Sequence, residues 1–379
     1  MKIGVSAFAG DGGKSGIGQY LINTLSRLPA LAPEDEFVVF VTRSACSALR
    51  LDQSDLDIAS VPDWVETPVI NILWHVLVFP LMLAIHGCDA AYLPAGNRRL
   101  GWWYGVPSIA TVHDLAQLHV TDKYDRWRMF YARNVLPRMI RRLTRVISVS
   151  TATSKDLESR IDVPGSKIRL VPNGFDRERF ENLEKSTARQ QVSEKFAIDS
   201  PYLLYVARLE HPGKNHVRLL EAFARLKELG LKQKLVLAGS RWSGADVIEA
   251  TVRELGLDDH VIFTGFVDND VLPCLYAAAD VFVFPSLFEG FGIPLLEAMM
   301  SGVPVCASEI ASIPEVVGEA SLLFDPREPA QIAKCIQEII ASNDLQSRLI
   351  SAGRKRAATF SWDASAGRVL DVLRECVST

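Results

Sequence analysis

The chain has 379 residues, of which 48% are hydrophobic and 23% charged, and its formal net charge is −4. This composition is typical of a soluble globular protein, and the lack of a basic excess disfavours nucleic acid as a partner. Because a single hydrophobic core rarely grows beyond about 250–300 residues, the length predicts two domains.

The cysteines and the first residues of the chain indicate the cellular compartment of the protein. Six cysteines are scattered along the chain without a C-x-x-C pair, and most have apolar neighbours. Buried thiols in a reducing compartment fit this pattern, and a zinc site does not. The chain begins with the strand-like run 2-KIGVSAF-8 and shows no secretory signal. We therefore expect a cytoplasmic protein.

The predicted strands fall into two series. Runs of β-branched and apolar residues of strand length alternate with helical stretches. The first series lies at 2–7, 37–42, 89–94, 107–112, 145–150 and 168–173, and the second at 202–207, 235–240, 261–266, 280–285 and 303–308. Such alternation predicts parallel sheets covered on both faces. We therefore expect an α/β protein with two doubly wound, Rossmann-like domains and a linker near residues 175–200.

In such a fold, function is expected in the loops that follow the strands. Ligands of open α/β sheets bind beyond the carboxyl ends of the strands. Two domains of this kind are expected to face a central cleft that these loops line.

The loop after the first strand, 9-AGDGGKSGIGQYL-21, is rich in glycine but matches neither common phosphate-binding pattern. The P-loop pattern needs a glycine where Phe8 stands, and the dinucleotide pattern needs one at Ser15. A P-loop ATPase and an NAD enzyme are therefore not supported. Gly16 and Gly18 remain, at the start of a helix, where the backbone could meet an acceptor or a phosphate; a structural turn explains them equally well.

An apolar stretch, 69-VINILWHVLVFPLMLAIHG-87, is nearly as long as a membrane span, which needs about 20 residues. Asn71, His75 and Pro80 interrupt it, and a spanning helix would break the order of the first sheet. We expect a buried helix or one that lies at an interface.

His113 follows the strand-like run 109–112 and so belongs to a loop at a strand's carboxyl end. Its ring can donate a hydrogen bond to a substrate hydroxyl. A lone histidine is more often structural, but this placement favours a functional role.

The stretch 126-RWRMFYARNVLPRMIRRLTR-145 carries seven arginines among aromatic and aliphatic residues. A basic amphipathic helix of this kind can lie on anionic lipid. A solvated helix face above the core is the alternative. Peripheral contact with the inner face of a membrane would then be made through 69–86 and 126–145.

In the second series, the first strand ends in 207-ARLEHPGKNH-216, which brings the positive charges of Arg208 and Lys214 to a loop with Gly213. Together with a helix N-terminus, such charges can neutralise a pyrophosphate. Basic loop residues alone would be an ordinary solvated surface.

The run 285-PSLFEGFGIPLLEAMMSGVPV-305 follows the strand-like 280-DVFVF-284 and forms a strand-to-helix turn. Gly290 and Gly292 let a ligand approach the backbone closely, and Pro294 suits the first position of a helix. The helix start directs free N–H groups and a positive dipole end at the turn, where an anion would bind.

Two carboxylates, Glu289 and Glu297, lie on either side of this turn. Acidic residues near a helix start are often only structural. A capping box does not explain Glu297, because Pro294 stands where that motif needs Ser or Thr. From the glutamates alone, a structural and a functional role are equally supported.

Six motifs together resemble the retaining glycosyltransferases of family four, which have the GT-B fold. They are GIGQY, VHDL, SVSTATSKDL, VPNGFD, ARLEHPGKN and FEGFGIPLLEAMMSGVPV. The similarity covers nearly the whole chain, and the last motif, with two glutamates around GFG, is its most specific part. It implies an acceptor-side domain over 1–180, a donor domain over 200–358, and a last helix, about 360–379, that crosses back to the first domain.

The resemblance implies roles for the charged loop residues. Arg208 and Lys214 would bind the diphosphate of a nucleotide-sugar donor, Glu289 the transferred sugar and Glu297 the ribose hydroxyls. His113 would reach the sugar from the first domain. The catalytic candidates are thus His113, Glu289, Arg208 and Lys214.

The resemblance also implies contacts of the donor with a glycine-rich turn, a base pocket and the first loop. In the glycine-rich turn, the contacts would be made by Gly290, Phe291 and Gly292. The base pocket would include Phe266 within 263-FTGFV-267, and the first loop would contribute Gly16 and Gly18.

The implied reaction needs neither a cofactor nor a metal ion. Charge develops on the phosphate oxygens as the nucleoside diphosphate leaves, and Arg208, Lys214 and amide dipoles would stabilise it. Two Asp-x-Asp matches lie in polar stretches and fit solvated loops. In this family a front-face reaction, in which the leaving phosphate takes the acceptor's proton, is preferred to a covalent intermediate.

GIGQYL together with VHDL looks most like bacterial mannosyltransferase-like members, which favours GDP-mannose as donor and a UDP-hexose as the second choice. The acceptor would be a glycan or a polyprenyl-linked glycan. A sugar phosphorylase would need a cofactor lysine for which there is no candidate, and a nucleotide-sugar epimerase is a further rival. A non-catalytic two-domain sugar-binding protein would normally carry an export signal.

Overall fold

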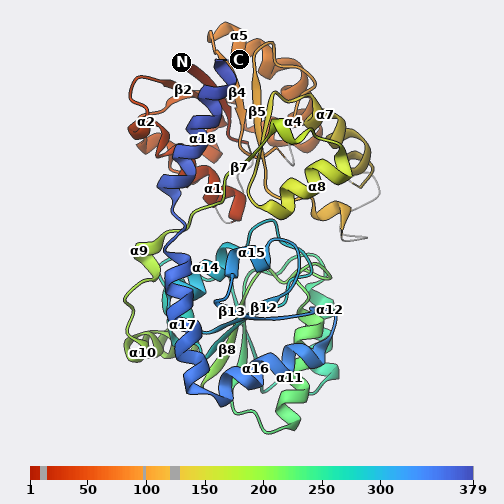
Figure 1. The fold of residues 1–379 in the computed structure, drawn as a ribbon, viewed down its shortest axis with the longest axis vertical. Helices are drawn as coiled ribbons and strands as arrows, with labels where there is room; N and C mark the ends of the chain where they lie inside the picture. The colour runs from red at the N-terminus through yellow and green to blue at the C-terminus, as the bar shows by residue number, and fades with distance from the viewer. Residues whose placement is uncertain (9–14, 97–99, 120–128, 379) are drawn as a thin grey trace. The chain divides into compact units, whose positions relative to one another are not determined.

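The computed structural model describes residues 1–8, 15–96, 100–119 and 129–378. The chain forms two compact units (Figure 1). The first comprises Met1–Gly174 together with Ser361–Thr379, and the second comprises Phe175–Phe360. Each unit has its own parallel sheet with helices on both faces, as expected for two doubly wound domains.

In the described part of the first unit, a seven-stranded parallel sheet has the order β3-β2-β1-β4-β5-β6-β7. The strands are β1 (Lys2–Ser6), β2 (Glu36–Thr42), β3 (Asp57–Val61), β4 (Ala90–Leu93), β5 (Ser108–Val112), β6 (Arg145–Ser148) and β7 (Ile168–Leu170). The inner strands are buried along almost their whole length because both faces of the sheet are covered. The strand order reverses between β1 and β4, and ligands of such folds bind at that switch point.

Two hydrophobic clusters cover the faces of the first sheet. Over one face lie α1 (Gly16–Leu25), α2 (Leu28–Leu31), α3 (Arg43–Ala48), the turn η1 (Leu51–Gln53) and α18 (Trp362–Val377). Over the other lie α4 (Pro68–Leu73), η3 (Trp74–Val78), α5 (Phe79–Ile85), η5 (Tyr131–Val135), α7 (Leu136–Arg142) and α8 (Thr151–Ile161). Single turns lie at η2 (Asp63–Glu66), η4 (Ala116–Leu118) and η6 (Gly165–Lys167).

The C-terminal helix α18 packs on the first unit although the second unit separates the two in sequence (Figure 1). Its buried side includes Val369 and Leu373, which join the cluster over β1 and β4. The backbone at Gly174 lies very close to the backbone of the returning chain. A Cβ at this position would lie 2.2 Å from the backbone nitrogen of Trp362. Only glycine allows this crossing of two backbones.

The apolar stretch predicted at 69–87 is one helical segment in three pieces, α4, η3 and α5, of which η3 is a turn of π-helix. One side of it is buried in the first unit. In the described ranges, no helix is both long and apolar enough to cross a membrane.

Over its described residues, which are continuous here, the second unit has a six-stranded parallel sheet in the order β10-β9-β8-β11-β12-β13. The strands are β8 (Tyr202–Val206), β9 (Lys234–Ala238), β10 (Val261–Gly265), β11 (Val281–Phe284), β12 (Val305–Ser308) and β13 (Ser321–Phe324). The reversal of strand order lies between β8 and β11, in the same place as in the first unit.

Two helices of the second unit precede its first strand and the others follow the strands; several pack in pairs, such as α10 with α13, α11 with α16 and α14 with α17. They are α9 (Arg177–Phe180), α10 (Lys185–Phe196), α11 (His216–Glu228), α12 (Ala245–Glu254), α13 (Leu272–Ala278), α14 (Ile293–Met300), α15 (Ile313–Val317), α16 (Pro329–Ala341) and α17 (Asn343–Ala357).

The two strands that sequence patterns did not predict, β3 and β13, are both edge strands. Each is short and mostly half-exposed. The other two edge strands, β7 and β10, were predicted, so edge position alone does not explain the omission. β3 carries the polar residues Asp57 and Ser60, and β13 has only four residues, so neither gives a long apolar run.

Candidate functional site

The loops that follow β8 and β11 meet at the switch point of the second sheet. The two strands are direct neighbours, paired in parallel through Leu203 and Val281. Their carboxyl ends therefore open side by side, one into the loop with Arg208 and Lys214 and the other into the glycine-rich turn with Glu289. This arrangement is where doubly wound sheets bind their ligands.

Lys214 and Glu289 form an ion pair across these two loops. The Lys214 ammonium donates to Glu289 Oε1 at 2.7 Å. The side chains keep 22% and 14% of their surface exposed, so a ligand can reach both. The pair thus places one cation and one carboxylate, 75 residues apart in sequence, at the same point of the fold.

Buried hydrogen bonds hold the two loops together beneath this ion pair. The Asn215 side chain donates to the carbonyl groups of Pro285 and Pro326, at 2.9 and 2.7 Å. The Tyr205 hydroxyl donates to the Lys214 carbonyl at 2.8 Å. Since both Asn215 contacts are buried, the backbone next to Lys214 is preorganised relative to the turn.

The glycine-rich turn ends in the helix α14, whose N-cap is Gly292 with a φ of 101°. Only glycine adopts this conformation readily. The Ser312 hydroxyl donates to the carbonyls of Glu289 and Phe291. Gly290 lies between these two residues. The turn therefore presents the start of α14, with its positive dipole end, beside the ion pair.

Arg208 lies in the same loop as Lys214 and is held from two sides. Its guanidinium contacts Glu210 Oε2 at 3.2 Å and lies over the ring of Trp242, 4.6 Å from the centroid. The side chain is 38% exposed, whereas that of Glu210 is 8% exposed. A guanidinium that is fixed in this way can bind phosphate oxygens with little loss of entropy.

Glu297 lies in the second turn of α14, on the far side of the glycine-rich turn from Glu289. The buried Tyr276 hydroxyl donates to its carboxylate at 2.8 Å. Burial raises the pKa of Glu297 to about 7, although the Tyr276 hydrogen bond and the Arg179 charge oppose this shift. The carboxyl group can accept further hydrogen bonds from hydroxyl groups, and it accepts them most strongly when it is ionised.

Phe266 follows β10, the edge strand that lies two strands away from β8. Its ring is 49% exposed. The residue is thus at the carboxyl end of the sheet like the other candidates.

Gly16 and Gly18 open α1 in the first unit. The Ser15 side chain caps this helix and accepts a hydrogen bond from the Gly18 amide at 3.3 Å. A Cβ at Gly16 would meet no atom within 4 Å. The backbone around Gly16 therefore does not need a glycine for packing. Residues 9–14, the rest of the predicted loop, lie outside the described part of the chain.

His113 directly follows β5 and is 7% exposed. Its Nε2 lies 2.7 Å from the Pro94 carbonyl, which can only accept, so that nitrogen carries the hydrogen. The ring also packs edge-on against Tyr20, at 4.7 Å between centroids. This hydrogen of His113 thus serves the fold, and donation from it to a substrate would require the bond to Pro94 to break.

The candidates divide between the units: Gly16, Gly18 and His113 belong to the first unit and the others to the second. Sequence reasoning did not find the residues that hold Arg208 and the loops. Trp242 and Tyr205 lie outside the quoted motifs and carry no charge, so no local pattern marks them, whereas Asn215 ends the motif ARLEHPGKN but was given no role. Glu210 stands inside the motif ARLEHPGKN and could have been noticed as a partner for Arg208.

Two family models match the chain. The model described as Glycosyltransferase Family 4 matches residues 14–179, and the model described as Glycosyl transferases group 1 matches residues 187–356. Between them they cover most of both units and leave out residues 1–13, 180–186 and 357–379.

Similar proteins include several mannosyltransferases. The chain is 30% identical over 259 residues to the O-antigen chain mannosyltransferase B of Escherichia coli, which covers 68% of this chain and 67% of that relative. It is 28% identical over 271 residues, 70% of this chain, to the serotype-specific mannosyltransferase WbdA of Escherichia coli, and spans only 33% of that protein.

Among solved structures, HepE of Anabaena in complex with UDP and glucose has a TM-score of 0.76 over 99% of this chain and 100% of that chain, at 19% identity. At this identity the likeness shows the fold.

Proposed function

Because this chain belongs to the family 4 glycosyltransferases of GT-B fold, we propose that it transfers mannose from GDP-mannose to a glycan or a lipid-linked glycan, with retention of the anomeric configuration. The ion pair of Lys214 and Glu289 carries this proposal, since it places a cation and a carboxylate at one switch point. In this proposal the reaction uses no metal ion.

The second unit would bind the donor's diphosphate with fixed positive charge. Arg208 and Lys214 lie in one loop, and the start of α14 adds its dipole and free N–H groups. These groups would neutralise the charge that develops on the phosphate as the nucleoside diphosphate leaves, which is where electrostatic catalysis contributes most. Glu297 in the second turn of α14 would accept hydrogen bonds from the ribose.

Donor binding would exchange the partners of the central ion pair. Lys214 would turn from Glu289 to the diphosphate, and the freed Glu289 carboxylate would accept hydrogen bonds from the sugar hydroxyls. Because the pair is partly exposed, its net contribution to stability is small, and the exchange costs little. The site would then bind the sugar and the phosphate together rather than either alone.

In the proposed front-face reaction, the acceptor oxygen forms a bond with the anomeric carbon on the side from which the diphosphate departs. The bond from that carbon to the phosphate oxygen breaks, and the departing oxygen takes the acceptor's proton. Arg208 and Lys214 would stabilise the GDP that results. Retention follows because attack and departure use the same face of the sugar.

GDP-mannose is the first choice of donor because relatives of this chain are named mannosyltransferases. A UDP-hexose is the alternative, since the similar structure of HepE contains UDP and glucose. A thermal-shift panel of nucleotide sugars would separate them, because a ligand at 100 times its Kd stabilises by about 2.7 kcal/mol.

The acceptor is proposed to be a glycan or a polyprenyl-linked glycan, and the protein to act in the cytoplasm with peripheral contact to the inner face of the membrane. The segments 69–86 and 126–145 would make this contact. Residues 126–128 of the second segment lie outside the described part of the chain.

The test is to incubate the protein with GDP-mannose and candidate acceptors and to measure GDP release and product configuration. We expect acceptor-dependent GDP release that EDTA does not reduce, and an α-linked product from the α-configured donor. Loss of activity in EDTA that a divalent cation restores would contradict the metal-free reaction, and an inverted product would contradict retention.

A further inference from the structure

Two exposed aromatic side chains follow neighbouring strands of the second unit, at the end of the sheet where doubly wound folds bind ligands. Trp242 stands in the loop after β9 and is 55% exposed, and Phe266 directly follows β10 and is 49% exposed. The two loops begin side by side, because the Gly239 amide donates to the Gly265 carbonyl at 2.9 Å. Exposed rings at this end of the sheet mark a surface for a flat or apolar ligand group.

Backbone pairing fixes the Trp242 loop against the loop that carries Arg208. The Leu209 amide donates to the Ser240 carbonyl at 2.9 Å, and the Trp242 amide donates to the Leu209 carbonyl at 3.2 Å. A Cβ on Gly239 would lie 2.1 Å from a backbone oxygen of the neighbouring loop, so glycine lets the two loops approach this closely. The indole is therefore held at a defined place beside Arg208.

One face of this indole is covered by Arg208, and much of the rest is open. The guanidinium lies 4.6 Å from the ring centre of Trp242, whereas more than half of the residue stays exposed. Because Arg208 covers one face, the exposed surface lies on the opposite face and at the ring edges. An aromatic face of this kind accepts a second flat ring in offset stacking. A flat binding surface thus lies directly behind the residue that is proposed to hold the diphosphate.

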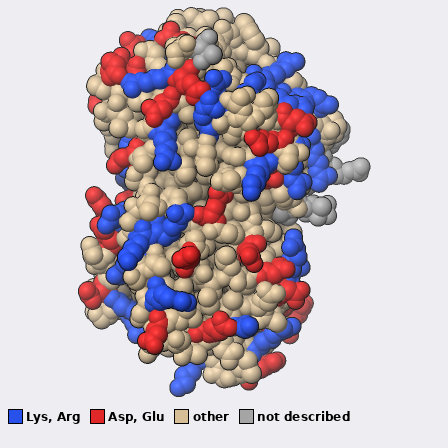
Figure 2. All heavy atoms as spheres, viewed as in Figure 1, with Lys and Arg blue, Asp and Glu red and all other residues tan. Residues whose placement is uncertain are grey.

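The Trp242 loop offers this ring rather than a further positive charge. Arg241, the preceding residue, forms ion pairs with Asp246 and Glu249 of α12. Figure 2 shows acidic and basic side chains interspersed over the face of the second unit in view. Selection of a nucleotide at this site would therefore rest on individual side chains and their geometry.

We infer that the nucleobase of the donor stacks on the face of Trp242 opposite Arg208, with Phe266 at the border of the same site. The choice of a nucleotide as ligand rests on the proposed function, in which the donor is a nucleoside diphosphate sugar. Base and diphosphate lie at the two ends of a ribose, so Trp242 would bind one end and Arg208 the other. Since the two side chains contact each other, they would bind the two ends as one unit.

Stacking on Trp242 also gives a physical reason for a preference between donors. A purine has two fused rings and covers more of an indole than the single ring of uracil does. The apolar area removed from water is therefore larger for guanine. Trp242 would thus favour GDP over UDP.

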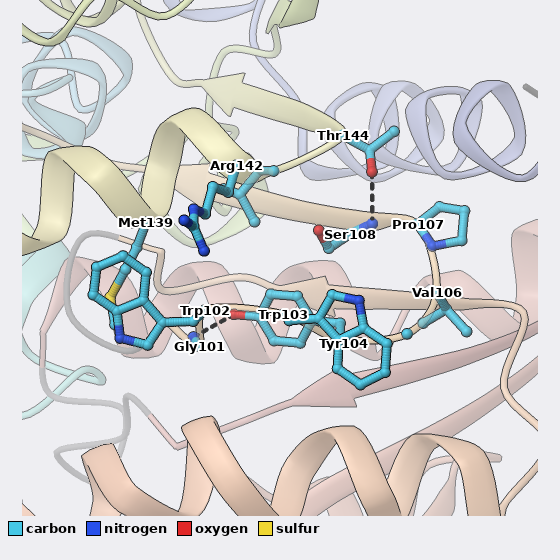
Figure 3. A pocket seen from close by; sticks show the side chains of 12 residues that line it. Gly101, Trp102, Trp103, Tyr104, Val106, Pro107, Ser108, Met139, Arg142 and Thr144 are labelled. Carbon is cyan, nitrogen blue, oxygen red and sulfur yellow. Dashed lines mark hydrogen bonds between the residues drawn. The ribbon is translucent and has the colours of Figure 1, made fainter.

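The first unit contains a similar stack at the end of its sheet where no donor is expected. Arg142 lies 5.1 Å from the ring centre of Trp102, beside a pocket of about 570 Å³ (Figure 3). The pocket is bordered by Ser108, which opens β5, and by Thr144, which precedes β6, and so lies at the amino ends of these strands. Ligands of doubly wound sheets bind at the opposite end. Trp102 therefore provides a matched control for Trp242.

The experiment compares the affinities of GDP, UDP and inorganic pyrophosphate for the whole protein by isothermal titration calorimetry. Trp242→Ala should weaken GDP binding by about 10- to 100-fold, because a stacked base loses its aromatic partner. UDP binding should lose less. Pyrophosphate has no base, so its affinity should fall only by about two- to fivefold, through the lost support of Arg208. Trp242→Phe keeps a ring and should restore most of the affinity for GDP.

Tryptophan fluorescence gives an independent measurement, because a base that stacks on an indole quenches its emission. We expect GDP, but not pyrophosphate, to quench part of the emission of the seven tryptophans. Trp242→Phe should bind GDP without this quenching. Trp102→Ala should bind all three ligands like the unchanged protein and keep the quenching. Thermal melting without ligand checks that each variant is folded.

Equal losses for GDP and pyrophosphate in Trp242→Ala would overturn base stacking and leave Trp242 as a support for Arg208 only. Unchanged quenching in Trp242→Phe would overturn it even if Trp242→Ala fails to fold. Larger losses for GDP and UDP than for pyrophosphate, without sugar transfer to any acceptor, would support base stacking and count against the transferase.

Discussion

The two units have the same strand order but place different chemistry at their switch points. In the second unit, charged groups meet there: Lys214 bonds Glu289, and Arg208 lies in the same loop. In the first unit, three neutral hydroxyls meet beneath the loops. Tyr20 bonds Tyr92 at 2.8 Å, and Thr111 lies 3.0 Å from each of these two hydroxyls.

This difference teaches that the topology decides where a ligand binds and the side chains decide which ligand. Burial raises the pKa of the Tyr20 and Tyr92 phenols, so the hydroxyl cluster stays neutral. The three hydroxyls are fully buried and bond one another, so they stabilise the fold beneath the loops. The charged groups of the second unit stay partly exposed and can meet an anionic ligand.

The largest effect that would sharpen this comparison comes from Lys214→Ala. It removes the cation and leaves Glu289 without its partner, so kcat/KM should fall by about 10²–10³-fold. Steady-state GDP release measures this. Lys334→Ala removes an exposed lysine that pairs with Glu338 within one helix, and it should leave kcat/KM unchanged.

A Lys214→Ala protein that keeps most of its activity would contradict the functional difference between the two switch points. The charged switch point would then be a structural feature like the hydroxyl cluster. Thermal melting of the variant should stay near that of the unchanged protein, because a partly exposed ion pair contributes only about 0–1 kcal/mol.

The next largest effect is on the pH dependence of the folding stability, which Glu297→Gln should change. The folded-state pKa of Glu297, about 7, lies above its ordinary value of 4.5. The contribution of this carboxyl to stability is thus complete below pH 4.5 and is lost as the pH rises through 7. The variant, which cannot ionise, should equal the unchanged protein at pH 4.5 and be more stable by about 1–3 kcal/mol at pH 8.

Denaturant unfolding at the two pH values measures this difference. Glu254→Gln changes an exposed glutamate on α12 and should show no such dependence on pH. Equal stability of the Glu297→Gln and unchanged proteins at pH 8 would show that the carboxyl is not buried enough to matter.

The smallest effect is expected from Tyr20→Phe in the first unit. Tyr92 and Thr111 can still bond each other, so the change should cost about 1 kcal/mol and lower the Tm by about 2–4 °C. GDP release should change less than threefold. Tyr202→Phe, which removes a buried bond to the Leu275 carbonyl in the second unit, is the matched control for stability. A tenfold loss of activity in Tyr20→Phe without a lower Tm would make the cluster part of the reaction.

Much of the fold was predictable from sequence because inner parallel strands are buried on both faces. Runs such as 37–41 and 281–284 are apolar throughout and stand out between helices. The edge strands β3 and β13 lack this signal and were missed. The helix α14 begins at Ile293, one residue before the predicted Pro294, since Gly292 forms its N-cap.

The sequence by itself determined the two doubly wound domains, the family, and the charged residues of the candidate site, because burial periodicity and local motifs are properties of short stretches. Only the tertiary structure decided that Lys214 bonds Glu289, that Trp242 lies against Arg208, and that the leucines of the 69–87 stretch face outward. These facts depend on which strands become neighbours and on which side of a helix meets the core. Residues far apart in sequence settle both, so no local pattern records them.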